Sequence, residues 1–268
     1  MNNYHYFSRF AALAGFSASP SADFATLSAL HQRWPALIPF ENIEVLLGRP
    51  VSIDVEKIAD KLLSKQRGGY CFEHNLLLRQ ILEEIGFRVT PHLARVLWGQ
   101  DKPDATPQTH MLLTVALDGV RYLADVGFGG VSLTAPLRLE AGEQQGYRLE
   151  RFSQEEWLLS MKSGGSWRLM YRFADGACEQ ADILVASHFV ATYDESLFRH
   201  NLMMAKIING QQTNLFNRHL TVYGEEKRQQ EAASFTDFRA LILSFFTADN
   251  VLSETEIRAI YEKLAEII

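Results

Sequence analysis

Hydrophobic residues recur every three or four positions in the first third of the chain, which is the spacing of a helix with one buried face. This pattern predicts helices over residues 52–66 and 72–85. Gly86 follows the second helix and is a residue type that commonly ends helices. The glycine pair at 68–69 predicts a break between the two helices.

The beginning of the chain has the same helical character. Residues 1 to about 30 are predicted to be helical, with Ser21 or Asp23 as N-cap. Pro35 and Pro39 then interrupt the pattern and predict an extended or turned link, because proline disfavours helix continuation.

From residue 87 onward the pattern becomes that of strands. Residues 87–97 alternate in polarity, and residues 99–108 hold two prolines and two aspartates, which predicts a loop. Strands over 109–117 and 120–126 flank Asp118-Gly119, a strong signal for a two-residue hairpin turn. Further short strands are predicted over 137–139, 147–152, 157–161 and 167–173. Short strands at this spacing indicate a compact barrel or a curled sheet.

Beyond residue 186 the pattern is mixed. The predicted elements are a helical link near 188–198, strands over 202–208 and 215–222, and a helix over 235–246. Asn209-Gly210 marks a turn between the two strands, and Ser253 with Glu256 is a capping box that opens a last helix. The order predicts an α+β chain with three domains: helices over 1–86, strands over 87–186, and a linker with a mixed α/β region over 187–268.

Composition limits the functional classes. The 268 residues are 47% hydrophobic and 22% charged, which is ordinary for a globular protein. The net charge of −6 argues against a general basic surface for nucleic acid. Two cysteines are too few for a disulfide scaffold and fit a reducing cytoplasm, and no apolar run is long enough to span a bilayer. The first residues lack the layout of a signal peptide, so we expect a cytoplasmic protein that does not insert into a membrane.

The strongest candidate nucleophile is Cys71. It lies in the motif RGGYCFEHN (67–75), at or near the N-terminus of the helix predicted over 72–85. Unpaired N–H groups and the helix dipole stabilise negative charge at that end, and the thiolate is the nucleophilic form of cysteine. The alternative is a buried structural cysteine, which is the commonest fate of a free thiol.

The predicted hairpin offers the base and the orienting acid that a cysteine nucleophile needs. A two-residue turn pairs Leu117 with Val120. In that register His110 and Asp125 share one face of the hairpin as diagonal neighbours, within reach of each other. A slip of one residue would put them on opposite faces.

Together these motifs resemble the arylamine N-acetyltransferase family. RGGYCFEHN, the pair Thr109-His110 and LADVGFG (123–129) lie in that family's order, and IPFEN (38–42) matches its N-terminal motif. The resemblance runs from about His31 to Leu137 and has a weaker echo in residues 201–220. The family often has a second histidine where this chain has Trp34, a departure outside the expected chemistry.

The resemblance implies a fold and a reaction. The fold is an N-terminal helical bundle, a central β-barrel-like domain and a C-terminal α/β lid, with a cysteine-protease-like Cys-His-Asp core. The reaction is a ping-pong transfer in which Cys71 takes the acetyl group from acetyl-CoA and gives it to an arylamine, an arylhydrazine or an N-hydroxyarylamine. His110 deprotonates Cys71, and Asp125 holds the imidazole and stabilises its charge.

Further residues are expected around this core. The Arg67 guanidinium suits a carboxylate fork, and we predict an ion pair with Glu41 that anchors the loop carrying Cys71. Contacts with the substrate or CoA are expected from Phe40, Thr109, Gly127, Phe128, Gly129 and Phe198. For the glycines the alternative is a tight turn leaving a strand, and for Phe40 and Phe198 it is core packing.

No metal site is expected. His74 lies three residues after Cys71, but a zinc site needs three or four clustered ligands, and Cys178 has no partner at ligand spacing. His74 is predicted to be a core or surface residue. The remaining histidines are predicted to be structural or solvent-facing: His5, His31, His92, His188, His200 and His219.

Two other functional classes remain open. The same Cys-His-Asp set would serve a hydrolase or a transglutaminase-like acyl transferase acting on proteins, because the chemistry is shared. The aromatic residues and the glycine run beside the site favour a small ligand. A degenerate, non-catalytic binding module is the third hypothesis, and the intact Cys71, His110 and Asp125 argue against it.

Overall fold

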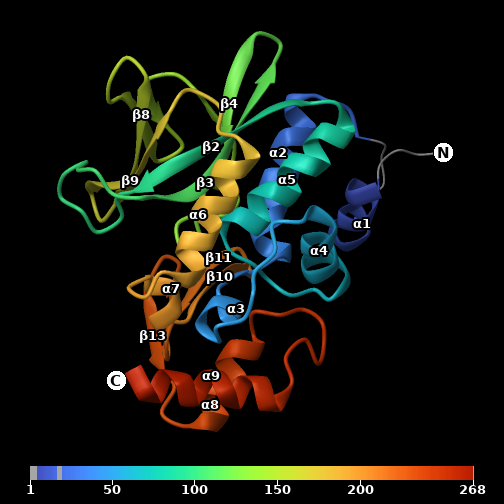
Figure 1. Cartoon of the computed structure of the whole chain (residues 1–268), viewed down its shortest axis with the longest axis vertical. Coiled ribbons are helices and arrows are strands. Elements are labelled where there is room, and N and C mark those ends of the chain that lie inside the picture. Colours follow the sequence, from blue (N-terminus) through green and yellow to red (C-terminus); the bar gives the residue numbers. More distant parts are fainter. Residues whose placement is uncertain (1–4, 17–19, 268) are drawn as a thin grey trace.

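Helices build the first part of the chain (Figure 1). The computed structural model describes residues 5–16 and 20–267, so residues 1–4 and 17–19 of the helical region predicted over 1 to about 30 lie outside the described residues. The first two helices are α1 (His5–Ala14) and α2 (Phe24–Leu37). The Asp23 carboxylate accepts a hydrogen bond from Thr26 N–H at 2.7 Å, which confirms Asp23 as the N-cap of α2.

Pro35 does not interrupt α2 as predicted. It lies in the last turn of the helix, which continues to Leu37. A proline there removes one N–H donor close to the end of the helix, where few further intrahelical bonds depend on it.

The segment before Cys71 is helical but not a single α-helix. It contains α3 (Ile43–Leu46), α4 (Val55–Ala59) and the π-helical turn η1 (Asp60–Ser64). The next helix, α5 (Cys71–Ile85), begins at Cys71 itself. The helix predicted over 52–66 therefore consists of α4 and η1, and the helix predicted over 72–85 is confirmed as α5. Gly86 ends α5 in the left-handed region, with φ 104°.

An eight-stranded antiparallel sheet forms the middle of the chain, in the order β5-β4-β3-β2-β9-β8-β7-β6. Its strands are β2 (Arg88–Val96), β3 (Gln108–Leu117), β4 (Val120–Ala124), β5 (Leu137–Arg138), β6 (Gly142–Gln144), β7 (Tyr147–Arg151), β8 (Glu156–Ser163) and β9 (Ser166–Ala174). Leu117 pairs with Val120, so the predicted register of the hairpin is confirmed. Asp118 and Gly119 have φ values of 50° and 76°, as the tight turn requires.

Two helices link this sheet to the end of the chain. They are α6 (Gln180–Thr192), which lies beside β3, and the short α7 (Leu197–His200). The predicted helical link thus begins earlier than residue 188, and the division predicted at residue 186 falls within α6.

A second sheet combines one strand from the N-terminal part of the chain with four strands from the C-terminal part. Its order is β1-β10-β11-β12-β13, with β1 (Phe40–Glu41), β10 (Met203–Ile208), β11 (Gln211–Phe216), β12 (His219–Tyr223) and β13 (Arg228–Glu231). The single strand predicted over 215–222 is wrong. Asn217 adopts a left-handed φ of 53° and turns the chain, which divides the segment between β11 and β12. The apolar residues on both sides of the turn hid this break.

The last helices, α8 (Phe235–Leu243) and α9 (Glu254–Ile267), lie at the opposite end of the molecule from the β3–β4 hairpin (Figure 1). Ser253 N–H donates to Glu256, and Glu256 N–H donates to the Ser253 hydroxyl, which confirms the predicted capping box. Separate buried clusters lie between the N-terminal helices and β3, inside the eight-stranded sheet, and between α8, α9 and the second sheet. The predicted α+β architecture is therefore confirmed.

Candidate active site

Cys71 is the first residue of α5, at the helix end where unpaired N–H groups gather. Only 3% of its surface is exposed, and its Sγ donates to the carbonyl oxygen of Thr109 at 3.8 Å. The Glu73 side chain accepts a hydrogen bond from Tyr70 N–H at 3.0 Å, so it caps the turn that presents Cys71. Thr109 thus meets the sulfur through its main chain, and its side chain is half-buried.

His110 and Asp125 meet as the predicted hairpin register requires. His110 Nε2 lies 2.7 Å from Asp125 Oδ2, and both residues are buried. Asp125 directly follows β4, and its other oxygen accepts hydrogen bonds from Gly127 N–H at 2.9 Å and from Asn75 Nδ2 at 3.0 Å. Because Nε2 is used by Asp125, Nδ1 is the imidazole nitrogen left for Cys71.

The charges of this set support one another. Burial by itself lowers the pKa of His110, but the Asp125 charge, the hydrogen bond with Asp125 and a hydrogen bond with Cys71 outweigh it and raise the pKa to about 10. Burial raises the pKa of Asp125, but the His110 charge and the hydrogen bonds to the carboxylate bring the net pKa below its ordinary value. The site therefore holds an imidazolium–carboxylate pair at neutral pH.

Two aromatic rings enclose the imidazole of His110. The ring of Phe128 meets it edge-on, with centroids 5.0 Å apart, and the ring of Tyr171 lies at 5.2 Å. Tyr171 is fully buried on β9. Burial and the charge of Asp125 hold the pKa of Tyr171 well above its ordinary value, so its hydroxyl stays protonated.

Three residues of the site were not predicted from the sequence: Asn75, Tyr171 and His31. Asn75 follows Cys71 by four residues on α5, so helical spacing alone could have placed it on the same face. Tyr171 reaches the site only because β9 pairs with β2, a contact that no local pattern reveals. His31 is buried, as a structural histidine can be, but its Nε2 accepts a hydrogen bond from Asp125 N–H at 3.2 Å.

The glycines after Asp125 allow the chain to pack closely. A Cβ at Gly127 would lie 2.8 Å from the Cα of Cys71, so this loop rests directly on the start of α5. Gly129 has a φ of +84°, and a Cβ there would lie 3.3 Å from the Phe40 ring. The close neighbours of both glycines are therefore protein atoms, and a ligand contact at this loop stays a prediction.

Phe40 and Phe198 come from distant elements and meet beside the nucleophile turn. Their ring centroids are 6.0 Å apart, and Phe198 also meets the ring of Tyr70 edge-on at 6.1 Å. Phe198 is half-buried, whereas Phe40 is 7% exposed.

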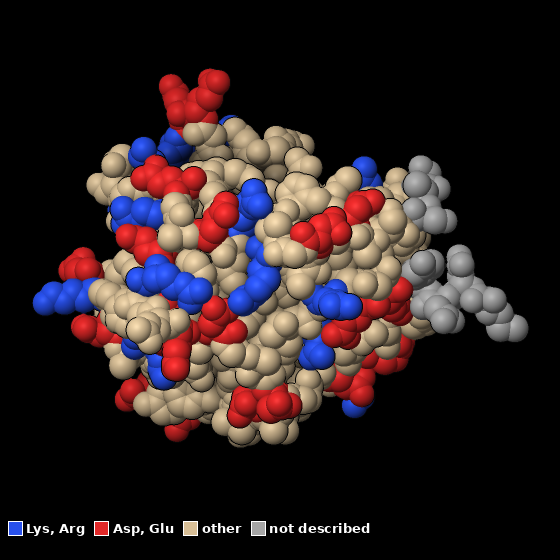
Figure 2. All heavy atoms as spheres, turned by 90° about the horizontal axis from the view of Figure 1, so that it is seen from above, with Lys and Arg blue, Asp and Glu red and all other residues tan. Residues whose placement is uncertain are grey.

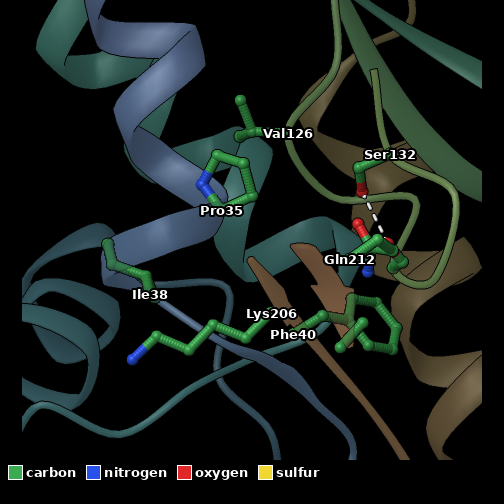
Figure 3. Close-up of a pocket in the computed structure, with 9 residues that line it drawn as sticks. Pro35, Ile38, Phe40, Val126, Ser132, Lys206 and Gln212 are labelled. Atoms are coloured by element: carbon green, nitrogen blue, oxygen red, sulfur yellow. Dashed lines mark hydrogen bonds between the residues drawn. The ribbon is translucent and has the colours of Figure 1, made fainter. Parts of the chain in front are cut away.

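Figure 3 shows the region behind Phe40, where the Ser132 hydroxyl donates to the Gly129 carbonyl at 3.0 Å. A cavity of about 10 Å³ lies here, with Gln212 and Ile38 in its lining. This volume holds at most one water molecule, so the cavity is not a substrate pocket.

The predicted contact of Arg67 with Glu41 is present within a larger ionic cluster. Arg67 Nη2 lies 3.4 Å from Glu41 Oε1 and 3.0 Å from Glu44 Oε1, and Nη1 lies 3.7 Å from Glu256 Oε1. The guanidinium therefore divides its contacts among three carboxylates instead of forming a fork with Glu41. Lys61 extends the cluster, because its Nζ lies 3.9 Å from Glu41 Oε1 and 2.8 Å from Glu73 Oε1.

His74 is a core residue and ties the nucleophile turn to α2. The Trp34 indole N–H donates to His74 Nδ1 at 2.7 Å, and His74 Nε2 lies 2.9 Å from the Gly69 carbonyl oxygen. Burial lowers the pKa of His74 to about 4, so the ring is neutral and Nε2–H is the donor to Gly69. Within the described ranges, no three or more His, Cys, Asp or Glu side chains are placed to hold a metal ion.

The chain is similar to acetyltransferases over most of its length. Residues 23–247 match a family model described as N-acetyltransferase. An arylamine N-acetyltransferase from Mycolicibacterium smegmatis is 37% identical over 267 residues, covering 95% of each chain. The arylamine N-acetyltransferase / N-hydroxyarylamine O-acetyltransferase of Salmonella typhimurium is 40% identical over 202 residues, 74% of this chain and 72% of that protein. The solved structure of Mycobacterium marinum arylamine N-acetyltransferase in complex with CoA has a TM-score of 0.88 and 31% identity, and covers 96% of this chain and 98% of that one.

Proposed function

The chain belongs to the arylamine N-acetyltransferase family, and we propose that Cys71, His110 and Asp125 carry its acetyl transfer. The donor is acetyl-CoA, and the acceptor is an arylamine, an arylhydrazine or an N-hydroxyarylamine. The observation that carries the proposal is the buried 2.7 Å contact between His110 and Asp125, beside a cysteine at a helix N-terminus.

In the first half-reaction the Cys71 thiolate attacks the carbonyl carbon of the acetyl thioester. The thiolate of CoA leaves as the carbonyl re-forms and takes a proton from the His110 imidazolium. Asp125 keeps the imidazole oriented through Nε2, so that Nδ1 faces the sulfur. The N–H groups in the first turn of α5 support the oxyanion of the tetrahedral intermediate. The products are acetyl-Cys71, CoA and a neutral imidazole.

In the second half-reaction the amine nitrogen attacks the acetyl-Cys71 carbonyl. The neutral His110 takes a proton from that nitrogen as the bond forms, and the Cys71 thiolate leaves. The thiolate–imidazolium pair is restored for the next cycle. One thiol that alternates between two states gives ping-pong kinetics.

The proposed entrance for donor and acceptor is formed by three half-buried residues: Thr109 beside the Cys71 sulfur, Phe128 beside His110 and Phe198 beside Tyr70. The CoA complex of the Mycobacterium marinum relative supports acetyl-CoA as the donor. Figure 2 shows one face, on which acidic and basic side chains are interspersed, and the expectation of no nucleic-acid partner stays a prediction. No helix in the described parts of the chain is long and apolar enough to cross a membrane.

The test is the intact mass of the protein after mixing with acetyl-CoA. We expect a gain of one acetyl group, mapped to Cys71, and its loss when an arylamine is added with formation of the acetylated amine. Cys71→Ala should abolish the gain, and Cys178→Ala should keep it, because burial and the nearby Asp182 raise the pKa of Cys178 to about 11.

Two results would contradict the proposal. Acetylation at Cys178 would exclude Cys71 as the nucleophile. Release of free acetate at the same rate with and without the amine would indicate a hydrolase.

A further inference from the structure

The short helix α7 places an aromatic ring next to the nucleophile turn. Phe198 is its second residue, and the Phe198 ring meets the rings of Phe40 and Tyr70 edge-on. None of the residues of α7 is fully buried, and Leu197 is 70% exposed. The Phe198 ring packs against the buried cluster of the N-terminal helices, and hydrogen bonds to the main chain of α7 fix the backbone that carries it.

Asn42 supplies a buried anchor for this segment. Its Nδ2 donates to the carbonyl oxygens of Phe198 at 2.8 Å and of Asn201 at 2.7 Å. Its Oδ1 accepts from Met203 N–H at 2.7 Å. Asn42 itself is 2% exposed, and its three hydrogen bonds lie in part-buried surroundings.

The next two side-chain hydrogen bonds of the segment reach different atoms. Ser196 Oγ donates to the Val190 carbonyl at 2.6 Å, and the exposed Arg199 donates to the Thr192 carbonyl at 2.9 Å. Neither of them holds residue 198 itself. Asn42 is thus the side chain that fixes the main chain at Phe198, and it does so from the turn that directly follows Phe40-Glu41.

We propose that Asn42 is a positioning residue for the acceptor: by holding the main chain at Phe198, it places the Phe198 ring as a wall for the aryl group. The inference rests on the proposed function, because it assigns the wall to the second half-reaction. It follows that Asn42 favours aromatic amines over small non-aromatic acceptors, which do not reach the ring. Acetyl transfer from CoA to Cys71 does not depend on this wall.

The two half-reactions can be measured apart. Acetylation is followed by intact mass after mixing with acetyl-CoA. Acetyl-enzyme freed of acetyl-CoA is then mixed with aniline or with hydrazine, and the loss of the acetyl mass gives a second-order rate constant for each. For Asn42→Ala we expect the aniline rate constant to fall about threefold to tenfold, the worth of one aromatic contact. The hydrazine rate constant and the acetylation rate should stay within about twofold.

Three further variants keep the test decisive. Asn42→Asp keeps the shape and the acceptor for Met203 but removes both donors, so it should act in the same direction if Asn42→Ala does not fold. Phe198→Ala should lower the aniline rate by itself, and adding Asn42→Ala should then cause no further loss. The matched control is Thr114→Val, which removes a buried hydrogen bond between β3 and His92 of β2 at 2.8 Å and should leave the ratio of aniline to hydrazine rates unchanged.

The outcomes separate the inference from the proposed function. Equal losses with aniline, hydrazine and acetyl-CoA would show a general structural role for Asn42 and overturn the inference alone. An unchanged aniline rate would do the same. A wild-type protein that gains no acetyl group at Cys71 would overturn the proposed function, and the inference with it.

Discussion

At the scale of single residues, we expect the reactivity of Cys71 to depend on the buried carboxylate of Asp125. Asp125 keeps the His110 imidazole charged, and a charged imidazole stabilises the thiolate beside it. Asp125→Asn keeps the shape of the side chain but removes its charge. We expect iodoacetamide to inactivate this variant at the rate of an ordinary cysteine, and acetylation to slow by roughly two to four orders of magnitude.

The pH profile of the inactivation rate provides the check for Asp125→Asn. At neutral pH, where a pKa raised to about 10 keeps His110 charged, wild type should react faster than the variant. Coincident profiles for the two proteins would remove Asp125 from the set.

The same scale shows what a sequence can reveal about a site. The placement of Cys71, His110 and Asp125 could be predicted because each lies in a local pattern: a helix start, a strand and a tight hairpin. Tyr171 could not be found in this way, because its contact with His110 depends on how the sheet curls between β3 and β9. The division of Arg67 among three carboxylates also depends on α9, which lies far along the chain.

At the scale of elements, the Asp118-Gly119 turn sets the geometry of the site. The turn fixes which residues of β3 and β4 are opposite each other, and side chains alternate between faces along a strand. One glycine inserted between Asp118 and Gly119 should move His110 and Asp125 to opposite faces, or force a bulge that separates them. We expect acetylation to fall as strongly as in Asp125→Asn.

A matched insertion separates this effect from a general loss of folding. The turn at Asn209-Gly210 joins β10 to β11 and carries none of the three proposed catalytic residues. One glycine inserted there should leave most of the acetylation rate. If both insertions give the same activity and the same thermal unfolding, the register of the β3–β4 hairpin does not control the site.

Elements with a strong local signal were predicted with nearly correct bounds. α5 has regular apolar spacing and a glycine stop, and the β3–β4 hairpin has a turn that fits two residues only. The two-residue strand β1 had no such signal, since it exists only because Phe40 pairs with Ala205, which is far along the chain. The split between β11 and β12 was missed because a left-handed Asn217 leaves the apolar pattern unchanged.

At the scale of the whole molecule, the ionic cluster around Arg67 connects distant parts. It joins Glu41 of β1, Glu44 of α3 and Glu256 of α9 to the loop that carries Cys71. A double-mutant cycle of Arg67→Ala and Glu41→Ala should show a coupling of roughly 0.5–3 kcal/mol in the free energy of unfolding. The reason is that removing either side chain leaves the charge of the other buried without this partner. Additive losses in urea unfolding would show that the pair does not interact.

Arg67→Lys should also lower the free energy of unfolding, since lysine cannot reach three carboxylates with one planar group.

The pH dependence of stability gives a second test at this scale. Burial lowers the pKa of His31 and of His74 to about 4, and it lowers the pKa of His92 as well. Below their ordinary pKa near 6.5, the unfolded chain therefore binds protons that the folded chain does not, and stability falls as the pH falls. Burial raises the pKa of Glu73, so the folded chain takes up that proton before the unfolded chain does as the pH falls. Glu73 therefore adds stability with falling pH, but only at the acid end of the range.

His110 acts in the opposite direction, because its folded pKa is raised to about 10. Its contribution is complete below about pH 6.5 and is lost as the pH rises toward 10, since only the folded chain then keeps the proton. Each group changes the free energy of unfolding by about 1.4 kcal/mol per pH unit within its range. Urea unfolding should therefore show a maximum near pH 6.5, with the steeper slope on the acid side, where at least two histidines act together. His31→Gln should flatten the acid slope and Asp125→Asn the alkaline slope, and a stability that keeps rising above pH 6.5 would contradict a charged His110 in the folded protein.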